Sequence, residues 1–132
     1  MSNHETSEPL QRYHATAAIL VLLTLTGVML LALFSRTVPH PPLEVPPFAL
    51  GPFLCASLAI GAAAFHLLRQ GVRYGGTLAV LFALTVLLSF GPQKYFDPAF
   101  SRIWPAVITA QIAVIVIVAW SIVALRSGRP TS

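Results

Sequence analysis

The chain has 132 residues, of which 56% are apolar and only 9% are charged, and its formal net charge is +4. About a quarter of the residues of a soluble domain are charged, so the composition excludes an ordinary water-soluble domain and predicts an integral membrane protein. No basic patch with interleaved aromatic residues occurs, and we therefore expect no nucleic-acid partner.

Four windows are long and apolar enough to cross a bilayer, which takes roughly 20 residues. They cover approximately residues 14–34, 50–68, 74–91 and 104–125, and none contains an Asp, Glu, Lys or Arg. Each window is predicted to be a helix, because a lone strand cannot satisfy its backbone N–H and C=O groups in lipid. The predicted fold class is all-α, a bundle of four transmembrane helices in a membrane domain over 14–125, with polar cytoplasmic tails at 1–13 and 126–132.

The first window is predicted to be an uncleaved anchor rather than a signal peptide. Its apolar core is longer than the 7–15 residues that are usual in a signal peptide, and "LALFSRTV" contains no small-x-small cleavage site. Cleavage, which would leave three spans and an external N-terminus, is the alternative.

The distribution of basic residues predicts which way the spans run. In a four-span arrangement five basic residues lie on one side and three on the other: Arg12, Arg69, Arg73, Arg126 and Arg129 against Arg36, Lys94 and Arg102. Basic residues prefer the cytoplasmic side, so both termini are predicted to be cytoplasmic and the protein to be a multi-pass protein of the inner (plasma) membrane.

The second window carries small residues at a spacing of four, Cys55, Ala59 and Ala63, with Ser57 and Gly61 beside them. Small residues let helix backbones approach closely in lipid. The window over 50–68 is therefore predicted to be the central packing helix. Because Cys55 is the only cysteine, neither an intrachain disulfide nor a multi-cysteine metal site is expected.

Ionisable groups within the spans are restricted to two histidines, His14 and His66, which lie near the predicted cytoplasmic edge. Two histidines at matched depth on different helices are able to bind a b-type haem axially. Solvated interfacial histidines are the simpler interpretation, and no cofactor is predicted; haem ligation by His14 and His66 is kept as an alternative.

Gln111 is the most polar side chain within a span, and Thr85 and Ser89 lie in the same outer half of the membrane. The first prediction is an interhelical hydrogen bond among them, which is worth about 0.6–2 kcal/mol. The functional alternative is a polar pocket formed by Gln111, Thr85 and Ser89 that takes a quinone head group or a small substrate.

The connector before the fourth window, "FGPQKYFDPAFSRIW" over 90–104, places Lys94, Asp97 and Arg102 among five aromatic residues. An interfacial connector explains most of this composition, because aromatic rings prefer the membrane boundary. Mixed charge beside aromatics also suits docking to the outer loop of another protein. The predicted docking residues are Lys94, Tyr95, Phe96, Asp97 and Arg102.

Two short segments resemble motifs of known families. "PLEVPPF" over 42–48 resembles the P-x-E motif of small membrane carotenoid cyclases, which implies an acid role for Glu44. "GPQKYFDPAF" over 91–100 resembles the G-x-x-K-x-x-D-P segment of the DoxX-like four-span family. Each resemblance covers ten residues or fewer, and no family is assigned from it.

The predicted function is that of a non-catalytic accessory or assembly subunit of a larger membrane complex. The expected partners are the lipid bilayer and other integral membrane proteins. Two alternatives remain open: a redox protein that handles haem or quinone, and a small transporter built by oligomerisation. A polar pore stripe would indicate the transporter, whereas the spans show only scattered Thr, Ser and Gln.

Overall fold

The computed structural model describes residues 7–36, 47–72 and 74–126, with the side chains of 7–9 and 47 left out. These residues form α1 (Ser7–Ser35), α2 (Pro47–Arg69), α3 (Gly75–Phe90), the short 3-10 helix η1 (Pro92–Phe96) and α4 (Phe100–Arg126), and they contain no strand. All four α-helical segments are long and apolar enough to cross a membrane, the third with η1 as its continuation. The predicted all-helical class with four membrane-length helices is confirmed.

Three helices extend beyond the predicted windows. α1 begins at Ser7 rather than at residue 14, so much of the predicted polar tail is helical. α2 begins at Pro47 rather than at residue 50. α4 begins at Phe100 rather than at residue 104, so Pro105 lies inside the helix. The reason is physical: hydropathy marks the hydrocarbon core, whereas a helix continues into the headgroup region, where water satisfies its terminal groups.

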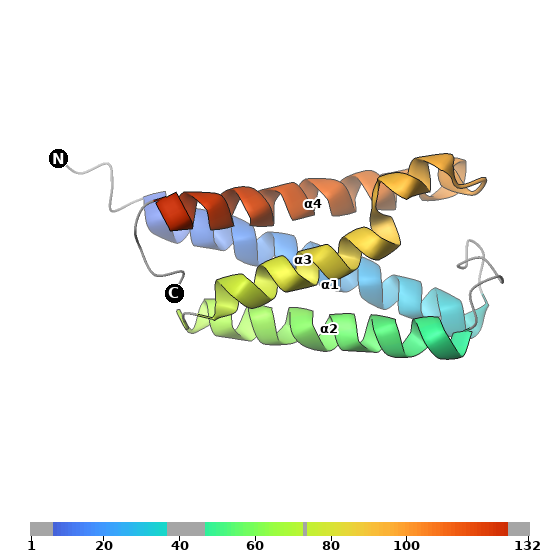
Figure 1. The fold of residues 1–132 in the computed structure, drawn as a ribbon, viewed down its shortest axis with the longest axis horizontal. Helices are drawn as coiled ribbons and strands as arrows, with labels where there is room; N and C mark the ends of the chain where they lie inside the picture. The colour runs from blue at the N-terminus through green and yellow to red at the C-terminus, as the bar shows by residue number, and fades with distance from the viewer. Residues whose placement is uncertain (1–6, 37–46, 73, 127–132) are drawn as a thin grey trace.

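The helices run alternately up and down (Figure 1). α1 packs against α2 and α4, α3 packs against the same two helices, and α1 and α3 make a smaller contact across the bundle. A tight turn joins α2 and α3: the N–H of Gly71 donates to Leu68 O at 3.2 Å and that of Val72 donates to Leu67 O at 2.9 Å. Gly71 has a φ of 71°, a conformation that glycine adopts without strain.

The core centres on Phe82 of α3, which is fully buried. Its ring packs where α2 has no side chain: a Cβ on Gly61 would lie 2.7 Å from two Phe82 ring carbons and 2.8 Å from Leu23 Cδ2 of α1. Apolar residues of all four helices complete this core: Ile19, Leu22, Leu68, Val107 and Ile117. The Phe82 ring of α3 therefore fills the space beside Gly61 of α2, where Leu23 of α1 also approaches.

The prediction that the second span is the central packing helix is wrong. Half of the membrane window of α3 is buried inside the bundle, against 28% for that of α2. Of the small residues that supported it, Cys55, Ala59 and Ala63 are exposed, whereas Ser57 and Gly61 lie on the buried face of α2. That face also contains Leu54, Ala64 and Leu68. Hydropathy does not separate the two faces, because lipid and core are both apolar.

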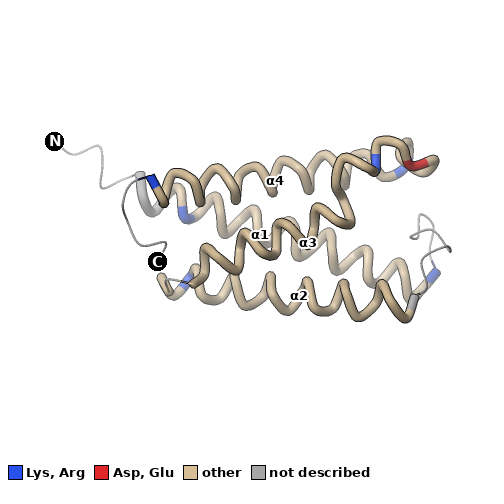
Figure 2. The backbone as a smooth tube through the Cα atoms, viewed as in Figure 1, with Lys and Arg blue, Asp and Glu red and all other residues tan. Residues whose placement is uncertain are grey.

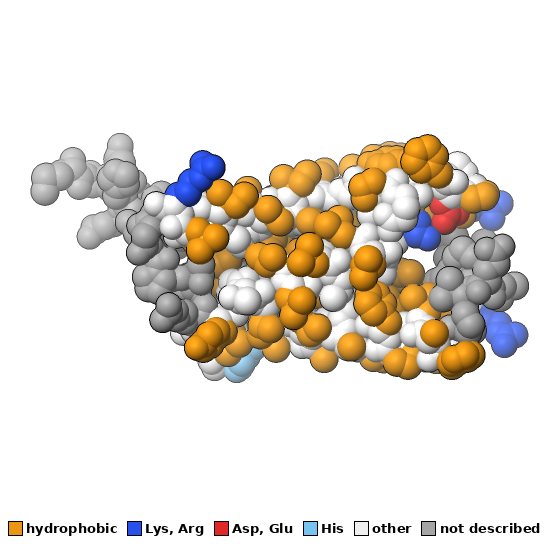
Figure 3. Space-filling model, in the orientation of Figure 1, with side chains coloured by type: hydrophobic (Ala, Val, Ile, Leu, Met, Phe, Trp, Pro, Cys, Tyr) orange, Lys and Arg blue, Asp and Glu red, His pale blue; other side chains and the backbone are white. Residues whose placement is uncertain are grey.

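Charged side chains occupy the two ends of the bundle and leave an apolar surface between them (Figures 2 and 3). Arg12, Arg69 and Arg126 lie at the end formed by the start of α1 and the ends of α2 and α4. The opposite end carries Arg36, Lys94, Asp97 and Arg102. Arg73 and Arg129 lie outside the described residues.

Candidate functional site

The connector between α3 and α4 is a structured element that begins by capping α3. The Gln93 side-chain amide donates to Leu87 O at 3.1 Å and to Leu88 O at 2.8 Å. These carbonyl groups belong to the last turn of α3, where a helix has no backbone donors left to offer. Gln93 therefore fixes the position of η1 on the end of α3.

Lys94 and Asp97 form an ion pair with each other inside this connector. Lys94 Nζ donates to Asp97 Oδ2 at 3.1 Å, and both side chains are largely covered. Asp97 Oδ1 accepts from the N–H of Ala99 at 2.9 Å, and Phe100 N–H donates to Asp97 O at 2.9 Å. Asp97 thus closes the turn from which α4 begins, in the manner of a helix cap. Two of the predicted docking residues therefore stabilise the loop itself.

The Asp97 carboxylate makes the stability of this turn dependent on pH. The Ala99 N–H and then the Lys94 ammonium hold the pKa of Asp97 below its ordinary value. A group with a lowered pKa stabilises the folded state above its unfolded pKa, near 4, and loses that contribution as the pH falls through the folded pKa. We expect Asp97→Asn, which keeps an acceptor for Ala99 but loses the ion pair with Lys94, to be less stable than the wild type at pH 7 by about 0.2–1 kcal/mol.

The measurement is thermal unfolding by circular dichroism in detergent between pH 3 and 7. The difference between wild type and Asp97→Asn should begin to shrink below about pH 4, where the unfolded carboxyl is protonated, and should disappear as the pH falls through the lowered pKa of the folded state. Asp97→Ala, which also loses the acceptor for Ala99, should remain destabilised throughout. A difference between wild type and Asp97→Asn that stays constant over this range would contradict the assigned role of the charge.

Tyr95 and Gln111 connect the loop to α4. The Tyr95 hydroxyl donates to Gln111 Oε1 at 2.8 Å, and Gln111 Nε2 donates to Phe90 O at 3.3 Å. The Tyr95 ring also packs on Phe100, with ring centroids 5.1 Å apart. Gln111 therefore joins α4, the end of α3 and η1, and Tyr95 is the third predicted docking residue that has a structural contact.

The remaining two predicted docking residues, Phe96 and Arg102, point away from the bundle. The Phe96 side chain is 91% exposed, although its neighbours on both sides are bound within the loop. Arg102 is exposed and has no partner among the described residues. Trp104, one helical turn into α4, is also exposed. The outward surface of the connector is therefore aromatic and carries one positive charge, that of Arg102, which is not paired with any described side chain.

The interhelical hydrogen bond predicted among Gln111, Thr85 and Ser89 does not form. Thr85 instead donates to Phe82 O at 2.7 Å and accepts from the Ser57 hydroxyl of α2 at 2.6 Å. Ser89 is buried without a hydrogen bond to either residue. The sequence shows the depth of each polar residue in the membrane but not the side of the helix on which it lies. The hydrogen bond between Ser57 of α2 and Thr85 of α3 therefore does not follow from the sequence. The quinone pocket stays a prediction.

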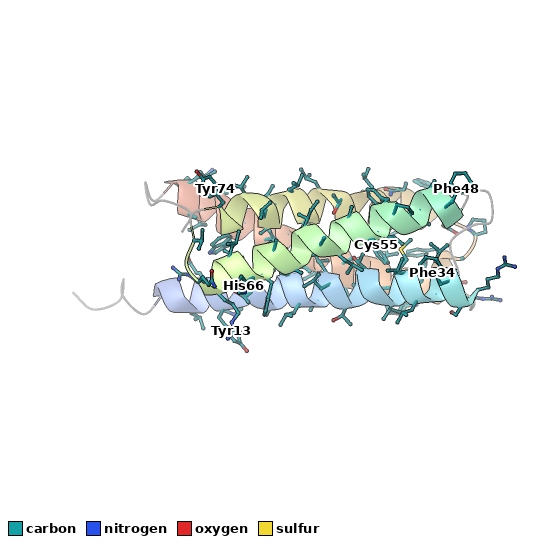
Figure 4. All side chains as sticks on the ribbon, turned by 90° about the horizontal axis from the view of Figure 1, so that it is seen from below. Tyr13, Phe34, Phe48, Cys55, His66 and Tyr74 are labelled. Atoms are coloured by element: carbon teal, nitrogen blue, oxygen red, sulfur yellow. The ribbon has the colours of Figure 1, made fainter. Side chains whose placement is uncertain are left out.

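The two histidines lie on the outside of the bundle, at the end that carries Arg12 and Arg69 (Figure 4). The His14 ring contacts the edge of the Tyr13 ring, with centroids 6.1 Å apart. His66 Nε2 is 2.9 Å from Gln70 Nε2. Neither ring reaches the interior, where apolar side chains fill the space between the helices. Within the described part of the chain no three His, Cys, Asp or Glu residues are grouped to hold a metal ion. Haem ligation stays a prediction.

Comparison with protein-family models, with curated proteins and with solved structures gives no match for this chain. Glu44, to which the cyclase-like motif would give an acid role, lies outside the described residues. The function therefore has to be argued from the arrangement of the connector.

Proposed function

We propose that this protein is a small, non-catalytic accessory subunit in a membrane, which docks to a larger integral membrane protein through the connector between α3 and α4. The observation that supports this most is Phe96, an aromatic side chain 91% exposed on a loop that is otherwise held by internal bonds. The proposed docking surface consists of Phe96, Arg102 and Trp104.

Preorganisation is the reason that this surface suits a partner. A loop already fixed by Gln93, Lys94 and Asp97 loses little conformational entropy when it binds. Aromatic and arginine side chains are also the residues that most often dominate binding energy at protein interfaces. Since Lys94 and Asp97 neutralise one another, the remaining charge is that of Arg102, and the partner surface should be acidic beside an apolar pocket.

The proposed orientation places both termini in the cytoplasm and the docking surface on the outer side of the inner membrane. Five basic residues against three support it, Arg73 and Arg129 included. Arg126→Cys and Phe96→Cys, each in a Cys55→Ser background, test it. A membrane-impermeant maleimide added to intact cells should label the cysteine at position 96 and leave that at position 126 unlabelled; the reverse pattern would invert the orientation.

Affinity purification from native membranes in a mild detergent, with quantitative mass spectrometry, tests the docking surface. We expect Phe96→Ala to lower recovery of a stoichiometric partner about tenfold, which corresponds to a loss of roughly 1.4 kcal/mol, within the range of interface hot spots. The matched control is Phe48→Ala, because Phe48 is 82% exposed at the same end of the bundle but belongs to α2. That variant should keep the partner.

The design leaves Lys94 and Asp97 unchanged, since their replacement would disturb the loop and confuse misfolding with loss of docking. A wild-type chain that purifies alone, or only with copies of itself, would contradict the accessory-subunit proposal. Equal loss of the partner in Phe48→Ala and Phe96→Ala would place the contact elsewhere on the bundle.

A further inference from the structure

At the end opposite the connector, α2 presents three polar side chains on one outward face. His66, Arg69 and Gln70 stand at positions i, i+3 and i+4, which are neighbours on a helix surface, and all three are exposed. They lie in the last turn of α2, where the helix leaves the predicted hydrocarbon layer. This depth is that of lipid headgroups.

Local contacts orient these three groups. The Arg69 guanidinium carbon lies 5.6 Å from the centroid of the Phe65 ring, so the side chain lies back along the helix toward the membrane. The Gln70 amide nitrogen lies 2.9 Å from His66 Nε2. An amide nitrogen only donates, so His66 Nε2 is the acceptor in this contact. The face therefore offers one cation, the second amide hydrogen of Gln70 and the imidazole ring of His66.

The charge of the surrounding described side chains is positive. Arg12 lies over the turn after α2, with Nη1 3.5 Å from the position of a Cβ on Gly71, and Arg126 lies at the same end. The one carboxylate among the described side chains, that of Asp97, lies at the opposite end of the bundle. An anion at His66, Arg69 and Gln70 is thus attracted by several guanidinium groups, whereas a quaternary ammonium is repelled.

We propose that His66, Arg69 and Gln70 bind the phosphodiester of an anionic phospholipid, one acyl chain of which lies along the outward face of α2. A phosphodiester carries a single negative charge and accepts several hydrogen bonds, which matches a guanidinium beside the Gln70 amide and the His66 ring. Phosphatidylglycerol fits this charge, and phosphatidylcholine, with its added cation, does not.

The same face of α2 has room for the chain. Toward the other end of the helix it exposes Ala63, Ala62, Ala59 and Cys55, and Phe48 is the one large apolar side chain that α2 exposes. From His66 to Cys55 the helix rises about 16 Å, at roughly 1.5 Å per residue. This length is close to half of the hydrocarbon thickness of about 30 Å.

Native mass spectrometry of the full chain in detergent tests the proposal by titration with phosphatidylglycerol and with phosphatidylcholine of the same acyl chains. Arg69→Gln is compared with Arg126→Gln, which removes an exposed arginine from the same end. We expect Arg69→Gln to weaken binding of phosphatidylglycerol about tenfold, as for the loss of a charge-assisted hydrogen bond, and Arg126→Gln to weaken it less than about twofold. Phosphatidylcholine should bind at least about tenfold more weakly than phosphatidylglycerol.

Two further arms complete the test. His66→Ala, which leaves Arg69 in place, should weaken binding of phosphatidylglycerol about threefold, as for a neutral hydrogen bond, and it stands in for Arg69→Gln should that variant not fold. Glycerol phosphate, the soluble headgroup alone, should not displace the lipid. Equal losses in Arg69→Gln and Arg126→Gln, equal binding of the two lipids, or no loss in His66→Ala would each overturn the proposal. Displacement by glycerol phosphate would assign the site to a free phosphate compound instead.

Discussion

Replacing Phe82 with alanine is expected to lower the free energy of unfolding by about 3–5 kcal/mol. The ring is fully buried at the centre of the core and packs against the backbone of α2 at Gly61 and against Leu23 of α1. Its removal leaves a cavity that three helices border, and helices tied into a bundle cannot close it fully. Reversible unfolding in mixed detergent and dodecyl sulfate micelles measures the loss. Leu88→Ala, an exposed leucine on the same helix, is the control and should change stability little.

A size exchange with Gly61 makes this prediction specific. Gly61→Ala alone should cost about 1–3 kcal/mol, because the new Cβ would overlap the Phe82 ring. In the Phe82→Leu background, where the ring is gone, the same change should cost much less. Additive losses in the double variant would show that Gly61 and Phe82 do not share one packing site.

Gly75→Ala is expected to destabilise the bundle by about 3 kcal/mol, toward the upper end of overpacking effects. A Cβ at this position would lie 2.8 Å from Leu68 N, 3.1 Å from Leu67 C and 3.2 Å from Leu68 Cα. These are backbone atoms at the end of α2, which cannot rotate away as a side chain does. The added methyl group must therefore push α2 and α3 apart at their shared turn.

The matched control is Gly27→Ala, the same chemical change in α1. A Cβ on Gly27 would meet nothing within 4 Å. Alanine is the better helix former by up to about 1 kcal/mol, so this variant should be as stable as the wild type or slightly more stable. The same unfolding assay applies. Gly75→Ala with wild-type stability would mean that α2 and α3 do not approach as closely as the structure has them.

Hydropathy alone predicted the four spans, because uninterrupted apolar windows of this length are typical of transmembrane helices and rare in soluble domains. It did not predict that α1 begins at Ser7 or α4 at Phe100, because both extensions contain polar or charged residues. Capping and turn geometry decide where a helix begins and ends. The turn before α4 depends on the hydrogen bond from the Ala99 N–H to Asp97, which hydropathy does not show.

The direction of each side chain around its helix was the part that sequence did not supply. Small size predicts Cys55, Ala59 and Ala63 inside as well as Ser57 and Gly61, but only the last two are buried, Gly61 beside the Phe82 ring. Gln111 was grouped with Thr85 by depth, whereas the structure directs Gln111 to Tyr95 and Thr85 to Ser57. In a soluble bundle polarity marks the outer face, but in lipid both faces are apolar and this mark is missing.

The composition of the connector distinguishes it from the spans, but the roles of its residues could not be read from composition. Lys94, Asp97 and Arg102 look equivalent in the sequence. Only the fold shows that the first two pair with each other and that Arg102 has no partner among the described residues.

The order of the helix contacts has a consequence for how the protein is made. α1 meets α2, α2 meets α3 and α3 meets α4, so each of these seams joins helices that leave the ribosome one after the other. Of the larger contacts, only that between α1 and α4 joins helices far apart in the sequence, and it cannot form until α4 has been synthesised. Before α4 is synthesised, the face of α1 that will pack on α4 therefore contacts lipid or an insertion factor. The packing of α4 against α1 then completes the bundle.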